Sequence, residues 1–201
     1  MLKDLLQKSR SYRSFDRTVS LSEKQLREWI SDVRFCPSSI NLQVLKFRPV
    51  LSEAECERVL SMTRWAAKLR DIHLPPAGHE PTAYIVVCAD TGITQAAATF
   101  EKDVGIAAQT IMLAAAEAGF GGCILGSFRA QELCEALALP EQMVPKLVLA
   151  LGKPDERVEL TDETEDGNVD YYRENGVHYV RKRPAEELVI SAAGGDRYAG
   201  K

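Results

Sequence analysis

Residues 99–118 read TFEKDVGIAAQTIMLAAAEA, and this stretch is the strongest structural signal in the chain. It has no proline, a single glycine at position 105 and many alanines, a composition that favours an α-helix. After Asp103 almost no polar face remains, so the helix must be buried nearly all round. It either runs through the core or packs against a second subunit. Gly119 is placed to end it as a left-handed cap residue.

The segments on either side mix strands and helices without strict alternation. Residues 45–51 and 83–89 read as strands, and the second is a continuous apolar run typical of a strand buried on both faces. Residues 20–35 predict an amphipathic helix whose capping box pairs Ser20 with Glu23. Further expected elements are one or two helices over 53–72, strands over 123–126 and 145–152, and a helix over 130–139. This pattern favours an α+β sandwich with helices around a central sheet.

Length and charge narrow the class of protein. A chain of 201 residues fits one domain, which we expect over 1–190, with a flexible tail over 191–201 and an extended arm rather than a second domain at 153–180. With 25 basic and 29 acidic residues the net charge is −4, which argues against nucleic-acid or membrane partners. No secretory signal or long apolar segment is present, so a cytoplasmic location is expected. Five cysteines without ligand spacing predict no metal site.

Two kinds of segment are candidates for binding. Residues 37–43, PSSINLQ, place two hydroxyls and two amides just after a helix, where they could contact a flat heteroaromatic ring or form an ordinary terminating loop. The basic clusters at 10–13 and 181–183 could each bind phosphate or be solvated surface. The glycines at 119–126 follow a helix and precede a strand, which is the wrong order for a dinucleotide loop. They are compatible with a strand whose backbone lies close to a ligand.

Four strings in this order resemble the FMN-dependent nitroreductase family: RSYRSF at 10–15, CPSSINLQ at 36–43, DVGIAAQ at 103–109 running to GFG at 119–121, and HYVRKR at 178–183. The resemblance spans nearly the whole chain. It implies a three-layer sandwich with a central, mainly antiparallel sheet surrounded by helices. It also implies an intertwined homodimer with two FMN sites, each built from both subunits.

The resemblance assigns each FMN site the following residues: Arg10, Ser11, Tyr12, Arg13, Ile124, Leu125, Gly126, Arg181 and Arg183, with Pro37, Ser38, Ser39 and Asn41 of the partner subunit. The arginines would hold the ribityl phosphate, and the partner's residues would face the isoalloxazine and ribityl chain. The backbone amide of Leu125, or of Gly126, would reach flavin N5. A cation at the pyrimidine edge stabilises reduced flavin; Arg13 is the first candidate, with Arg64 or Lys68 as alternatives. Ser9 departs from the family pattern, and 64–80 has no motif that fixes the substrate pocket.

The function implied is a ping-pong oxidoreductase. Hydride would pass from NADH or NADPH to flavin N5, and an electron-poor small molecule such as a nitroaromatic or a quinone would then be reduced. Two alternatives remain open. One is a different flavin reaction on the same scaffold, such as dehalogenation, enone reduction or cannibalisation of FMN. The other is a protein that binds flavin or senses redox state without turnover.

Overall fold

The computed structural model describes residues 1–69 and 71–190, which divide into two compact units with a boundary after Glu156. The units are treated separately below. The tail expected over 191–201 lies outside the described residues. The single domain expected over 1–190 stays a prediction.

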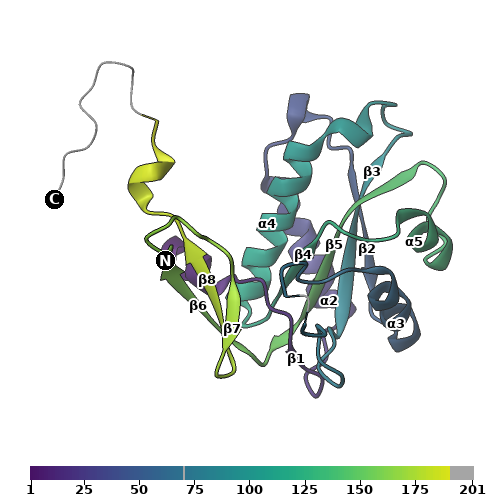
Figure 1. Ribbon diagram of the computed structural model, residues 1–201. Coiled ribbons are helices and arrows are strands. Elements are labelled where there is room, and N and C mark those ends of the chain that lie inside the picture. Colours follow the sequence, from purple (N-terminus) through teal and green to yellow (C-terminus); the bar gives the residue numbers. More distant parts are fainter. Residues whose placement is uncertain (70, 191–201) are drawn as a thin grey trace. The chain divides into compact units, whose positions relative to one another are not determined.

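The first unit contains five helices and five strands among its described residues (Figure 1). The helices are α1 (Leu2–Lys8), α2 (Glu23–Asp32), α3 (Glu53–Met62), α4 (Glu101–Glu117) and α5 (Ala130–Ala136). The strands are β1 (Phe15–Asp16), β2 (Leu45–Val50), β3 (Ala83–Asp90), β4 (Gly121–Leu125) and β5 (Met143–Pro154). Short 3₁₀ turns are η1 (Val33–Phe35), η2 (Ser39–Asn41) and η3 (Ala97–Thr99).

These strands form one sheet in the order β1-β5-β3-β2, and β4 also pairs with β5. Every pairing in the sheet is antiparallel. The longest pairing joins β3 to β5, from Ala83 opposite Leu151 to Asp90 opposite Met143. The prediction of a mainly antiparallel central sheet is confirmed.

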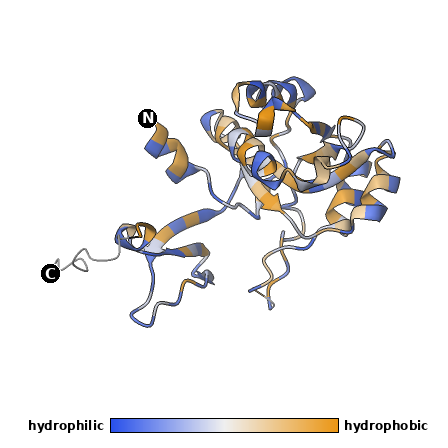
Figure 2. Ribbon diagram, turned by 90° about the horizontal axis from the view of Figure 1, so that it is seen from above, coloured by the Kyte–Doolittle hydropathy of each residue, from blue (hydrophilic) through white to orange (hydrophobic). Residues whose placement is uncertain are grey.

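Alternate residues of β3 enter two different cores. Ile85 and Val87 pack with α2 and α4, whereas Tyr84 and Val86 pack with α3 and α5 on the opposite face. A strand that is apolar on both faces must be covered on both faces, which explains the continuous apolar run. The result is the predicted three-layer α+β arrangement, with α4 and α3 visible on opposite sides of the sheet (Figure 1). In Figure 2 the helices of this unit carry both hydrophobic and hydrophilic stretches, as expected for covering layers.

Helix α4 confirms the predicted central helix, and Gly119 follows it with φ of +78°. Its buried side includes Val104, Ala108 and Ile111. A strip on its other side stays exposed in the single chain: Lys102, Gly105, Ile106 and Gln109. Helix α4 is therefore not buried on all sides within one chain. The exposed strip is compatible with packing against a second subunit, one of the two arrangements expected from the sequence.

Two helix boundaries differ from prediction. The cap of α2 is Ser22 rather than Ser20: Ser22 Oγ accepts from the backbone N–H of Gln25, and the Gln25 side chain accepts from the Ser22 N–H in return. Ser22 is favoured because Leu21, one residue before it, is then buried in the same core as Leu26, as in a hydrophobic staple. Of the one or two helices expected over 53–72, the described residues contain one, α3, which ends at Met62.

The second unit is a small sheet of three strands, β6 (Arg157–Asp162), β8 (Val177–Lys182) and β7 (Tyr172–Glu174), followed by η4 (Ala185–Leu188). Strand β6 runs parallel to β8, and β7 runs antiparallel to it. Tyr172 and Tyr179 lie opposite each other and stack with ring centroids 4.9 Å apart. The segment expected to be an extended arm thus forms its own paired strands.

Close packing explains the first glycines of β4. A Cβ on Gly122 would lie 1.9 Å from the carbonyl oxygen of Ala150, and one on Gly121 would lie 2.6 Å from the Tyr12 ring. The protein itself occupies that space, so these two glycines do not indicate close approach of a ligand. At Gly126 a Cβ would meet only Leu147 Cδ2, at 3.8 Å.

We predict that Gly122→Ala lowers the free energy of unfolding by at least about 1–3 kcal/mol, because a methyl group cannot fit against the strand backbone. Gly126→Ala is the matched control and should change stability by less than about 0.5 kcal/mol. Urea denaturation of both variants tests this, and equal stabilities would contradict the packing argument.

Candidate active site

The basic amino-terminal segment lies along the start of β4. Ser11 forms a parallel bridge with Gly122, and the Tyr12 N–H donates to the Gly122 carbonyl at 2.9 Å. Arg10 donates through Nη2 to the Leu6 carbonyl, while its buried Nε has no hydrogen-bond partner among the residues described. Burial raises the pKa of Tyr12, with the Arg10 charge opposing that effect. The pairing with β4 thus fixes Arg10–Arg13 as a group.

Arg13 is a buried cation, only 9% exposed. Its Nη1 donates to the Ser11 carbonyl at 3.2 Å, and its backbone N–H donates to the Glu156 carboxylate. Burial raises the pKa of the Cys123 thiol in β4. The positive charge of Arg13 opposes this shift, so the guanidinium influences a side chain of that strand. The structure therefore brings the predicted residues 10–13 together with the β4 segment that carries Ile124, Leu125 and Gly126.

The end of β4 presents an open edge for a ligand. Ile124 is 39% exposed and Gly126 is also exposed, whereas the Leu125 side chain is buried in the α3/α5 core. The predicted contacts at this position therefore fall to the Ile124 side chain and to backbone groups around Gly126.

A segment without a recognisable motif borders this edge. The Arg64 N–H donates to the Ser127 carbonyl at 2.9 Å, and the Arg129 N–H donates to the Met62 carbonyl at 3.0 Å. This places the exposed Arg64, an alternative candidate for the cation near the flavin ring, beside Gly126. Lys68 is exposed four residues further along the same segment. Because α3 ends at Met62, the residues that follow are free to pair with residues 127–129, and this pairing positions Arg64.

The polar turn at 37–43 is held by one carboxylate. Ser38 Oγ donates to Asp103 Oδ2 at 2.7 Å, Ser39 Oγ donates to Oδ1 at 2.6 Å, and the Ser39 N–H donates to both oxygens at 3.0 and 3.1 Å. Burial would raise the pKa of Asp103, but these hydrogen bonds outweigh it and the pKa is lowered. Asp103 lies in one of the strings that resemble the family, but the sequence did not indicate that its carboxylate holds the two serines in place. The hydroxyls of Ser38 and Ser39 are engaged within the protein.

The same turn carries a strained backbone. Ile40, Asn41 and Gln43 have φ of +46°, +56° and +51°, and positive φ is unusual for a β-branched residue such as Ile40. Ile40 is nevertheless 86% exposed. The Gln43 N–H donates to Ser38 Oγ at 3.0 Å, which helps hold the turn in place. Strain of this kind gathers at functional sites, and it leaves Ile40 and Asn41 facing outward.

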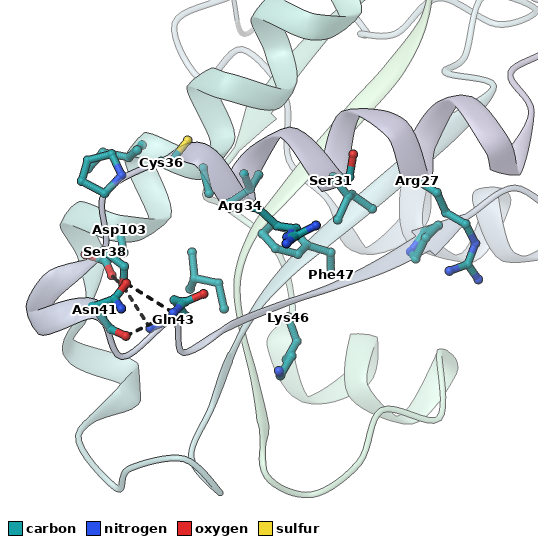
Figure 3. Close-up of a pocket in the computed structure, with 17 residues that line it drawn as sticks. Arg27, Ser31, Arg34, Cys36, Ser38, Asn41, Gln43, Lys46, Phe47 and Asp103 are labelled. Carbon is teal, nitrogen blue, oxygen red and sulfur yellow. Dashed lines mark hydrogen bonds between the residues drawn. The ribbon is translucent and has the colours of Figure 1, made fainter.

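A groove of about 460 Å³ opens beside this turn. Its walls come from α2 and η1, from β2 and from the start of α4, and its lining includes the predicted Pro37, Ser38 and Asn41. Figure 3 shows Ser38, Asn41, Gln43 and Asp103 gathered at one end of the groove, with Arg34, Ser31 and Arg27 following α2 away from them. The volume lies within the range of small-molecule pockets.

Arg181 and Arg183 belong to the second unit, where both already have partners. The Arg181 guanidinium carbon lies 4.6 Å from the centroid of the Tyr172 ring, and its Nη1 donates to the Asp170 carbonyl at 3.2 Å. Arg183 pairs with Glu163 at 3.2 Å and Glu187 at 3.4 Å. Phosphate binding by these two arginines stays a prediction.

Over residues 1–69 and 71–190, no group of three or more His, Cys, Asp or Glu side chains could hold a metal ion. No helix in that part of the chain has the length and apolar character needed to cross a membrane.

We predict that Asp103→Asn lowers the free energy of unfolding by about 1–3 kcal/mol at pH 7, because a neutral amide cannot accept all these hydrogen bonds. Since the folded-state pKa of Asp103 is lowered, its contribution is present above the unfolded pKa of about 3.9 and is lost as the pH falls through the folded value. Denaturation at pH 7 and at low pH should show the difference shrinking on acidification. A stability difference independent of pH would contradict the role given to the Asp103 carboxylate. Glu57→Gln, at an exposed position, is the control and should change stability little at either pH.

The chain is similar in sequence and in fold to known proteins. The model of the family described as "Nitroreductase family" matches residues 6–153. A protein of Methanothermobacter thermautotrophicus named "Putative NADH dehydrogenase/NAD(P)H nitroreductase" is 28% identical over 153 residues, which cover 73% of this chain and 74% of the relative.

Solved structures with the same fold include a nitroreductase family protein from Streptococcus pneumoniae, with a TM-score of 0.67 and 17% identity over 86% of this chain and 100% of that one. Another is a putative nitroreductase from Exiguobacterium sibiricum solved in complex with FMN, with a TM-score of 0.63 and 18% identity over 78% of this chain and 89% of that one. The family match covers well over half of the sequence, and the chain belongs to the nitroreductase family.

Proposed function

We propose that this chain is an FMN-dependent oxidoreductase that takes hydride from NADH or NADPH and reduces an electron-poor small molecule, such as a nitroaromatic or a quinone, by a ping-pong mechanism. The observation that carries the proposal is the pairing of the segment with Arg10 and Arg13 against β4, beside an exposed Ile124 and Gly126. The name of the archaeal relative and the FMN bound to the Exiguobacterium sibiricum protein support it. When bound, FMN would accept hydride at N5 and pass the electrons on.

The residues around β4 fit an anionic, planar cofactor. The buried Nε of Arg10, without a partner in the described part of the chain, is a hydrogen-bond donor available to a phosphate oxygen. Arg13 adds a buried cation that can favour negative charge on a reduced ring. Phosphate binding by Arg181 and Arg183 of the second unit, which stays a prediction, would compete with their carboxylate and aromatic partners.

The edge of β4 would position the reactive part of the cofactor. Gly126 leaves room for close approach, since even a Cβ there would meet only one atom within 4 Å. The backbone amide of Leu125 or Gly126 is proposed to donate to N5 and so to orient it. Arg64, fixed through Ser127, is available at the same edge as a second cation.

A homodimer is part of the proposal. The exposed strip of α4 contains Gly105 and Ile106, and an added Cβ at Gly105 would meet no atom within 4 Å. Phe35 and Ile40, each 86% exposed, lie in the adjoining turns. Contact with a second copy would cover these apolar groups and bring Pro37, Ser38, Ser39 and Asn41 of the partner subunit to the cofactor. Because Asp103 holds the two serine hydroxyls as donors, those serines would act toward a ligand as acceptors.

We predict that the purified protein loaded with FMN shows a flavin absorption band that bleaches on anaerobic addition of NADH or NADPH. Adding a quinone or a nitroaromatic should restore the band. A band that persists with both donors would indicate a protein that binds flavin without turnover. Failure to take up FMN at all would contradict the cofactor assignment, and reoxidation only by a halogenated or enone substrate would indicate another reaction on this scaffold.

We predict that Arg13→Ala weakens FMN binding by about 1.5–3 kcal/mol, because a hydrogen bond from a charged donor is lost. Fluorescence titration of FMN measures this, and circular dichroism reports whether the variant is folded. Arg13→Lys should retain part of the affinity, since it keeps the charge without the bidentate geometry. Unchanged affinity in a folded Arg13→Ala variant would remove Arg13 from the site; the exposed Arg58→Ala, on α3, is the control.

A further inference from the structure

We propose that the groove between α2 and β2 binds the phosphate groups of the dinucleotide donor, with Arg34 and Arg27 as the residues that recognise them. This inference rests on the proposed function, in which Pro37 and Asn41 of one subunit face the flavin bound by the other subunit. The groove connects those two residues to the arginines in a single cavity. A donor whose nicotinamide lies on the flavin can therefore extend its phosphates along α2.

Helical spacing places the polar residues of the groove in one row. Arg27, Ser31 and Arg34 are separated by four and three residues, so they lie on the same side of α2 and the η1 turn that continues it. The row covers about 10 Å along the axis. All three residues line the groove, and Figure 3 shows the side chains of Arg27 and Arg34 on the side of the helix that faces β2. A chain of phosphates running along α2 would meet one arginine after the other.

The local charge is opposite to that of the whole protein. The chain has a net charge of −4, yet the α2 and η1 wall of the groove carries two cationic residues, Arg27 and Arg34, and the one carboxylate in the lining is Asp103. That carboxylate already accepts hydrogen bonds from both Ser38 and Ser39. The groove is therefore an electropositive site on an acidic protein, which favours an anionic ligand.

The arginines are available for such a ligand. Arg34 is exposed and has no ion-pair partner among the residues that the structure describes. Arg27 pairs with Glu23 on its own helix at 2.6 Å, with both side chains more than half exposed, so the pair is weak and can exchange. Guanidinium groups bind phosphate oxygens in a bidentate manner, which suits a pyrophosphate or a ribose phosphate.

The opposite wall suits the organic part of the donor. Leu45, Phe47 and Pro49 of β2 line the groove, and Phe47 offers an aromatic surface that is only partly buried. Lys46 alternates with these residues along the strand, and in Figure 3 its side chain points away from α2. Lys46→Met is therefore a suitable control, because it removes one positive charge from the neighbouring strand β2, outside the row formed by Arg27, Ser31 and Arg34.

The experiment compares Arg34→Met, Arg27→Met and the control Lys46→Met, each as FMN-loaded protein. Steady-state KM is measured with NADPH and with 1-benzyl-1,4-dihydronicotinamide, a hydride donor that has no phosphate. Binding of NADP⁺ is measured by calorimetry, and FMN affinity by fluorescence titration. We expect KM for NADPH and the NADP⁺ dissociation constant to rise on the order of tenfold or more for Arg34→Met, with a smaller rise for Arg27→Met. KM for the phosphate-free donor, FMN affinity and the Lys46→Met control should be unchanged.

Three results would overturn the assignment. Equal effects on both donors would mean that the arginines do not recognise phosphate. Loss of FMN affinity would place them at the flavin phosphate, and loss of self-association by sedimentation would make the groove a subunit interface. If neither donor bleaches the flavin of the unaltered protein, the proposed function itself fails, which is a separate and distinguishable outcome.

Discussion

The antiparallel pairing of β3 with β5 is the constraint on which the rest of the fold depends. Strand β3 and residues 148–152 of β5 are buried on both faces, so the chain must supply a helical layer on each side. Strand β5 also carries β4 and β1. The two segments proposed to hold the cofactor, 10–13 and 124–126, are therefore positioned by one central strand and by the close approach of Gly122 to Ala150.

A second anchor connects the core to the polar turn. Asp103 lies in the first turn of α4, whose buried residues pack on the sheet, and its carboxylate holds Ser38 and Ser39. Hydrogen bonds to a buried carboxylate are strong because the surroundings exclude water. This gives the positive-φ residues that follow, Ile40 and Asn41, a fixed base. The strained turn is thus supported by the same helix that packs on the sheet.

Much of the fold could be predicted from the sequence because burial leaves a direct pattern. The apolar run of β3 and the alanine-rich α4 follow from hydrophobicity alone. The helix start at Ser22 could not be separated from Ser20, since both are followed three residues later by Glu or Gln, and only the burial of Leu21 decides. The end of α3 at Met62 depends on pairing with residues 127–129, a long-range contact without a local signal.

The candidate site was less predictable for a related reason. Motifs identified residue types that bind FMN, but not which of their polar atoms the protein itself uses. Asp103 engages the two serine hydroxyls, and Arg183 is paired with Glu163 and Glu187. Arg64 gains its position through backbone pairing of its segment with residues 127–129, which no spacing rule could reveal. Which partners the buried and charged groups find depends on the folded structure and cannot be read from a short sequence motif.

The central claim is that FMN binds where the amino-terminal arginines meet β4, and a crystal structure of the FMN-loaded protein tests it most directly. The account predicts the flavin phosphate on Arg10 and Arg13, the ring against Ile124 with N5 near the amides of Leu125 and Gly126, and the turn with Asn41 of the partner subunit over the cofactor. Flavin bound elsewhere, or a ring without contact to β4, would contradict it.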